Sequence, residues 1–220
     1  GQPPLRLCFV FFLFLLLPVT IRFSSAVFSR KRTRKPFIGY VAFLSGMSGF
    51  SCITILTYLY QIKIGSLYSD IGIISAASLC GYALGAIIAR RIKHTGRRTV
   101  ITVFFCIQGL LALILLSVKL PLLLENRVEF IILMLLLGSF HGALYPLLSE
   151  YTAFAYKGKL GNFLGLYALE LVGSAAGAVL TGIIWLGTIG LFYTVLLIFA
   201  AIALCIMLSF GSAFSKMTID

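Results

Sequence analysis

Apolar runs of about 20 residues recur along the whole chain, and this feature restricts its fold most. An α-helix rises about 1.5 Å per residue, so a run of this length crosses the hydrocarbon core of a bilayer. Only 11% of the 220 residues are charged, and 60% are hydrophobic. A soluble domain carries roughly 25% charged residues. We therefore expect an all-α, polytopic membrane helix bundle.

The apolar runs predict seven transmembrane helices, which cover residues 7–23, 37–61, 68–89, 99–118, 130–151, 163–186 and 191–210. The first has no cleavage-site pattern of a signal peptide, so we expect it to remain as an extra transmembrane helix. The predicted organisation is thus an extra helix with a basic linker (1–36), a six-helix membrane domain (37–210) and a cytoplasmic tail (211–220).

Positive charge is distributed unevenly between the two sides of this bundle. The net charge of +12 would suggest nucleic acid as the partner of a soluble protein. Here four cations fall on one side, namely Arg6, Lys63, Lys119 and Arg127. The other side holds Arg22, Arg30, Lys31, Arg32, Arg34, Lys35, Arg90, Arg91, Lys93, Arg97, Arg98, Lys157, Lys159 and Lys216. Because Lys and Arg concentrate in cytoplasmic loops, the N-terminus is predicted outside and the C-terminus in the cytoplasm. We expect the bilayer, and no nucleic acid, as partner.

Two basic segments dominate the predicted cytoplasmic side. The first is the linker 30–35, whose cations favour anionic lipid headgroups by about 1 kcal/mol each, or an acidic soluble partner. The second is a basic loop between two apolar runs, with Arg90, Arg91, Lys93, Arg97 and Arg98.

Small residues recur at four-residue spacing, which indicates close helix packing in lipid. The clearest pairs are Gly81 with Gly85 and Gly173 with Gly177. We expect each pair to lie against the backbone of another helix.

Three polar residues within or at the ends of the apolar runs are candidates for a polar path. Ionisable groups inside membrane helices are costly and therefore default to functional hypotheses. Glu170 either binds a cation, relays a proton or pairs with a base, or it ties two helices together by a hydrogen bond. His141 either relays protons or bonds a neighbouring helix. Gln61 carries an amide that requires hydrogen-bond partners.

Metal binding and catalysis are not expected. Each of the five cysteines (Cys8, Cys52, Cys80, Cys106 and Cys205) lies alone inside an apolar run, which is neither metal-ligand spacing nor a disulfide framework. No nucleophile–base grouping is recognisable. We predict no cofactor, no metal site and no enzymatic activity for this chain alone.

An ordered set of small and aromatic motifs resembles the membrane domain of bacterial spermidine synthase-like proteins. The motifs cover residues 46–50, 60–61, 65–69, 81–85, 142–148, 166–170 and 173–177. These proteins resemble major facilitator transporters joined to, or partnered with, a spermidine synthase domain. The resemblance implies that residues 37–210 correspond to one half of such a transporter.

The basic loop resembles the major facilitator signature between the second and third helices of a half. Gly85, Arg90, Gly96, Arg97 and Arg98 fit it loosely, while Ala89 stands at its acidic position. The glycine-rich turn and the acidic residues of a synthase domain are absent, so any aminopropyl transfer would belong to another domain.

Two functions follow as hypotheses. The first is a multi-pass, transporter-like module of a bacterial inner membrane, handling a polyamine or another small cation. The second is a non-transporting anchor or scaffold of an electron-transfer or biosynthetic complex. In both cases we expect other protein subunits, or further domains of a longer chain, as partners.

Overall fold

The computed structural model describes residues 35–65, 68–92, 97–119, 124–156 and 160–214. Within them the fold is helical without strands, which confirms the all-α prediction. The elements are α2 (Lys35–Ile64), α3 (Tyr68–Arg91), α4 (Arg97–Lys119), α5 (Arg127–Tyr156), α6 (Leu160–Val179), a π-helical turn η1 (Leu180–Trp185), α7 (Leu186–Thr188) and α8 (Gly190–Phe214).

Four stretches of helix are long and apolar enough to cross a membrane, consistent with a multi-pass membrane protein. They are Gly39–Ile64, Asp70–Arg91, Arg127–Glu150 and Leu164–Thr188. Two further helices are apolar over shorter described stretches, Thr102–Ile114 and Gly190–Ala203. The structure thus supports four of the seven predicted spans. The predicted first helix, residues 7–23, lies outside the described residues.

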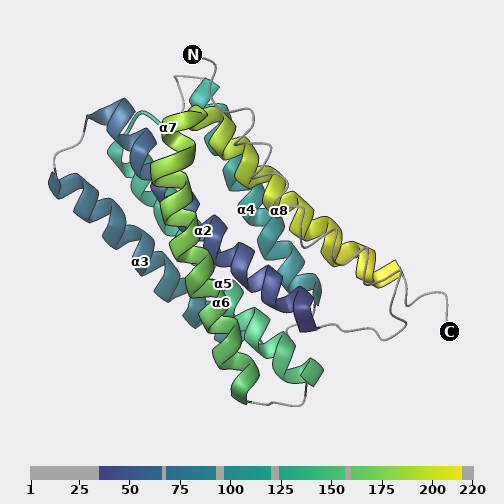
Figure 1. The fold of residues 1–220 in the computed structure, drawn as a ribbon. Coiled ribbons are helices and arrows are strands. Elements are labelled where there is room, and N and C mark those ends of the chain that lie inside the picture. The colour runs from purple at the N-terminus through teal and green to yellow at the C-terminus, as the bar shows by residue number, and fades with distance from the viewer. Residues whose placement is uncertain (1–34, 66–67, 93–96, 120–123, 157–159, 215–220) are drawn as a thin grey trace.

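Helix α2 occupies the centre of the described bundle. Two helix pairs make the most extensive contacts, α3 with α5 and α2 with α6, and α2 also touches α5 and α8. In its most apolar stretch 67% of the α2 residues are buried, against 22% in α3 and 22% in the span that includes α6. Figure 1 shows α2 crossing behind α6, with α4 and α8 on the other side. The outer helices α3 and α6 therefore present most of their apolar residues outward.

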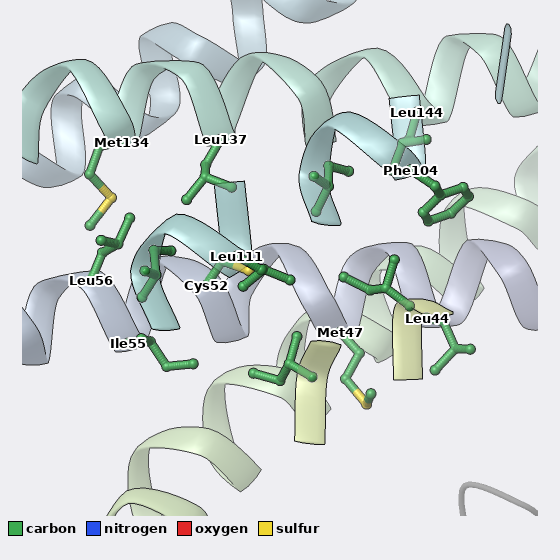
Figure 2. Packing of buried hydrophobic residues seen from close by; sticks show 14 of the residues in the cluster. Leu44, Met47, Cys52, Ile55, Leu56, Phe104, Leu111, Met134, Leu137 and Leu144 are labelled. Carbon is green, nitrogen blue, oxygen red and sulfur yellow. The ribbon is translucent and has the colours of Figure 1, made fainter. Parts of the chain in front are cut away.

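The hydrophobic core forms where α2, α4 and α5 meet. Long aliphatic and aromatic side chains from the three helices interdigitate there (Figure 2). The labelled members are Leu44, Met47, Cys52, Ile55 and Leu56 from α2, Phe104 and Leu111 from α4, and Met134, Leu137 and Leu144 from α5. This side of α2 is apolar throughout.

Glycines bring the backbones of α3 and α5 into direct contact. A Cβ atom at Gly85 would overlap the carbonyl oxygen of Ser139, and one at Gly81 would overlap that of Leu135. Gly138 and Gly142 of α5 face the backbone of α3 in the same way. Dispersion and backbone packing, rather than burial from water, hold such a contact together in lipid.

A similar contact joins α2 to α6. Gly173 lies against the carbonyl of Phe43, and Gly177 against that of Met47. In return, Gly46 of α2 lies against the carbonyl of Glu170. The two glycine pairs found by their spacing thus contact the backbones of different partners, Gly81 and Gly85 on α5, Gly173 and Gly177 on α2.

The span that begins with α6 contains a π-helical turn, which the sequence pattern did not predict. The turn η1 buries Thr181, whose hydroxyl donates to Ser51 Oγ at 2.7 Å. Ser51 donates in turn to the carbonyl of Gly177 at 3.3 Å. Wide turns of this kind leave backbone carbonyls without their usual partner and occur at functional positions. Here the hydroxyl chain fixes the turn against α2.

Candidate functional site

Four polar residues from four helices meet near the middle of the bundle: Ser48 of α2, Tyr82 of α3, His141 of α5 and Glu170 of α6. We call them the central polar cluster. Gly46 and Gly49, one turn apart on α2, are the points at which the other helices approach. Two of the four residues, His141 and Glu170, were predicted as candidates from the sequence.

His141 is the most enclosed member, with 2% of its surface exposed. Its Nδ1 lies 2.9 Å from the carbonyl oxygen of Leu137, and its Nε2 lies 3.3 Å from Ser48 Oγ. A carbonyl oxygen only accepts, so we assign the hydrogen of a neutral imidazole to Nδ1. Nε2 then presents its lone pair to Ser48. The histidine therefore bonds a neighbouring helix, one of the two roles expected for it.

Tyr82 reaches from α3 across to α2 at Gly49. A Cβ atom at Gly49 would overlap the Tyr82 hydroxyl and would lie 3.0 Å from the imidazole of His141. The centroids of the two rings are 6.5 Å apart. Gly49 thus provides the space that the phenol and the imidazole share, which no larger residue would leave open.

Glu170 lies on the stripe of α6 that faces α2. The stripe repeats at helical spacing through Leu166, Gly173, Gly177 and Thr181, all of which are buried. Glu170 itself is half-buried, and its carboxyl group lies within electrostatic range of the Tyr82 phenol. Its backbone carbonyl accepts a hydrogen bond from Ser174 Oγ at 2.9 Å.

No hydrogen-bond donor among the described residues reaches the carboxylate oxygens of Glu170. A charge at the centre of a membrane helix costs about 2.5 to 3.5 kcal/mol on insertion scales. An accessible carboxylate with free acceptor positions, placed in the middle of an apolar span, can compensate this cost by binding a cation. The alternative role expected from the sequence, a side-chain hydrogen bond between helices, is not seen here.

Gln61 is not brought together with the other two predicted residues. It lies exposed near the C-terminal end of α2, where its backbone carbonyl accepts from the amide of Gly65. Fifteen residues separate it from Gly46, which corresponds to about 22 Å along the helix. The amide of Gln61 therefore belongs to an end of the bundle and not to the central polar cluster.

A second polar cluster, which the sequence did not reveal as a site, closes the end of the bundle near Gln61. Asp70, in the first turn of α3, is 7% exposed and accepts a hydrogen bond from Tyr60 Oη at 3.1 Å. Arg127, at the start of α5, lies 3.6 Å from the other carboxylate oxygen of Asp70. The Tyr60 ring also packs edge-on against Phe130 at 5.2 Å. We call Tyr60, Asp70 and Arg127 the end cluster; it joins α2, α3 and α5.

For the end cluster we expect Asp70→Leu to lower the free energy of unfolding by about 1 to 3 kcal/mol, because the buried Tyr60 hydroxyl loses its acceptor. Asp70→Asn keeps an acceptor and loses only the ion pair. It should cost at most about 1 kcal/mol, because the Arg127 side chain is 60% exposed. Denaturation of both variants in detergent measures the difference. An equal loss in the two variants would show that the ion pair, and not the tyrosine bond, carries the stability.

The basic loop is described only at its flanks. Arg90 and Arg91 end α3 with exposed side chains, and Arg97 and Arg98 begin α4. Lys93 lies outside the described residues. Where the structure describes it, the chain therefore carries two helix ends rich in arginine at this loop.

Comparisons with protein-family models, curated proteins and solved structures give no match. Within the described ranges, no three His, Cys, Asp or Glu side chains are placed to hold a metal ion. The described cysteines, Cys52, Cys80 and Cys106, are free thiols. The chemistry open to the central polar cluster is therefore that of its own side chains, which are a carboxylate, a phenol, an imidazole and a hydroxyl.

Proposed function

We propose that the chain is a transporter-like integral membrane module that handles a small cation at the central polar cluster. The Glu170 carboxylate carries this proposal. It lies mid-span on the stripe that faces α2, and no donor within the described part of the chain occupies it. A purely structural carboxylate in this position would be expected to use its acceptor positions within the protein.

The surroundings of the carboxylate suit a cation. The Tyr82 phenol, within electrostatic range, offers a hydroxyl oxygen as a further ligand and a ring face for cation–π attraction. A second aromatic pair, Tyr145 of α5 and Tyr167 of α6, lies with ring centroids 5.5 Å apart. Tyr167 is one turn from Glu170, so the same side of α6 combines a carboxylate with an aromatic ring.

The resemblance to major facilitator transporters supports this interpretation at the level of architecture. Residues 37–210 would form one half of such a transporter, residues 1–36 an extra helix and linker, and 211–220 a cytoplasmic tail. A polyamine is the substrate that the resemblance to spermidine synthase-like proteins implies. A second half would come from another copy or another part of a longer protein, because substrate sites of these transporters lie between repeats.

The proposed orientation follows from the charges at the two ends of the bundle. Exposed Arg90 and Arg91 stand at one end with the start of α4, whereas the opposite end mixes Lys63 and Arg127 with Asp70 and Glu129. The arginine-rich end would face the cytoplasm of a bacterial inner membrane.

A membrane scaffold remains the second candidate, and the outer surfaces of α3 and α6 favour it. Ile87, Ile88, Leu164, Val172 and Ile183 are all more than half exposed. Such surfaces can meet lipid or the helices of a larger assembly. On this proposal the partners would be subunits of an electron-transfer or biosynthetic complex, and the central polar cluster would serve only packing.

Uptake by purified protein in lipid vesicles tests the proposed function. The probes are radiolabelled tetraethylammonium and radiolabelled spermidine, and protein-free vesicles give the background. We expect uptake above background for the wild type and a several-fold loss in Tyr82→Phe, which removes only the hydroxyl beside Gly49. Tyr193→Phe is the matched control, because Tyr193 is 62% exposed on α8. Background uptake of both cations by the wild type would reject transport and leave the scaffold.

A further inference from the structure

The hydrogen bonds around His141 have room for one more proton. In a neutral imidazole Nδ1 donates to Leu137, and Nε2 can only accept. The single hydrogen of Ser48 must then choose between Nε2 at 3.3 Å and the carbonyl of Ser45 at 3.0 Å. One of these two acceptors is left without it.

A proton on Nε2 satisfies every group in this chain of hydrogen bonds. Nε2–H then donates to Ser48 Oγ, and Ser48 donates to the Ser45 carbonyl, while Nδ1–H remains bonded to Leu137. The oxygen and nitrogen positions need not change, because only the direction of one hydrogen bond is reversed. The arrangement of α2 and α5 is therefore complementary to an imidazolium.

An imidazolium in this position needs a counter-charge, and the groups that face His141 provide one. Tyr82 approaches from α3, and Ser48 and Cys52 from α2; none of these three side chains carries a charge near neutral pH. The buried stripe of α4 is apolar, with Phe104, Ile107, Leu111 and Ile114. Glu170 of α6 supplies the carboxylate, and Tyr82 interacts with both residues.

From this charge balance we infer that the protein exchanges a monovalent cation for a proton, with the proton held at His141 and the cation at Glu170. The inference rests on the proposed function and assigns its coupling. One carboxylate balances one positive charge, so a proton on His141 and a cation at Glu170 exclude each other in an apolar span. When the cation binds, the proton leaves Nε2 for the water open to the site. Ser48 then turns its hydrogen to Nε2.

The test uses vesicles with an imposed pH gradient and tetraethylammonium as the probe, because this cation carries no proton of its own. For the wild type, an interior more acidic by about one pH unit should raise its accumulation about tenfold, the ratio set by one-for-one exchange. In His141→Gln the pH gradient should have no effect, while exchange of labelled for unlabelled tetraethylammonium continues. Ser48→Ala should weaken the response several-fold, and Ser139→Ala, whose hydroxyl bonds Leu135 within its own helix, should retain it.

Proton release in detergent gives a second measurement that needs no transport. Adding tetraethylammonium to wild-type protein should release a proton to a pH-sensitive dye, and His141→Gln should release none. Release that persists in His141→Gln would place the proton on Glu170 and overturn the inference. Uptake that ignores the pH gradient, or is driven by the opposite gradient, would also overturn it while the proposed function stands. So would spermidine uptake without tetraethylammonium uptake. Background uptake of both cations would end the proposed function as well.

Discussion

Gly85→Ala is expected to lower the free energy of unfolding by about 3 kcal/mol, the upper part of the usual range for overpacking. The added methyl group would overlap the backbone carbonyl of Ser139, which cannot turn away as a side chain could. Relief requires α3 and α5 to move apart, and this separation also loosens the contacts at Gly81, Gly138 and Gly142. Gly85→Leu should abolish folding altogether.

The matched control lies on the same helix. Gly72 of α3 is exposed, and no atom lies within 4 Å of the position that an added methyl group would take there. Gly72→Ala should therefore raise stability by up to about 1 kcal/mol, the difference in helix propensity between the two residues. Thermal and denaturant unfolding in detergent measure both variants. If Gly85→Ala were as stable as Gly72→Ala, the close approach of α3 and α5 would be wrong.

The sequence predicted the helices well because apolar runs of membrane length leave few alternatives. Helices over 35–64, 68–91, 97–119 and 127–156 each begin and end within a few residues of their predicted positions, apart from longer ends at α2 and α5. The π-helical turn η1 was missed, since a hydroxyl chain from Thr181 to Ser51 across two helices has no local pattern.

The glycine contacts were only half predicted. Spacing singled out Gly81 with Gly85 but not Gly138 with Gly142, although the second pair has the same four-residue spacing and forms the opposite face of the contact. The partner of a glycine pair cannot be read from one helix. Pairing all segments that carry this spacing would have suggested α3 against α5.

The candidate site was predicted in part. Glu170 and His141 stood out because charged or titratable side chains are rare in apolar runs. Tyr82 and Ser48 did not, because isolated tyrosines and serines are common in membrane helices and gain meaning only beside Gly49 and His141. Asp70 was noticed only as one of two aspartates, and its pairing with Tyr60 and Arg127 depends on how three helix ends meet.

The largest functional effect is expected from Glu170→Gln. This change keeps the shape and the hydrogen-bonding capacity of the side chain and removes its charge. On the proposed function the cation loses its counter-charge, so uptake of tetraethylammonium by vesicles should fall to the background of protein-free vesicles. The control is Glu150→Gln, which removes an exposed carboxylate near the end of α5 and should leave uptake unchanged.

Stability and activity should move in opposite directions in this variant. A charged carboxylate inside the span costs about 2.5 to 3.5 kcal/mol on insertion scales, and a neutral amide costs less. Glu170→Gln should therefore unfold at the same or a higher temperature while its uptake is lost, the pattern of a group kept for function at the expense of stability. A scaffold would respond differently: Glu170→Gln would change little, whereas Glu170→Leu would loosen the assembly by removing polar groups between α6 and α2. Full uptake in Glu170→Gln would show that the carboxylate binds no cation, and the central polar cluster would then be a packing feature of the bundle.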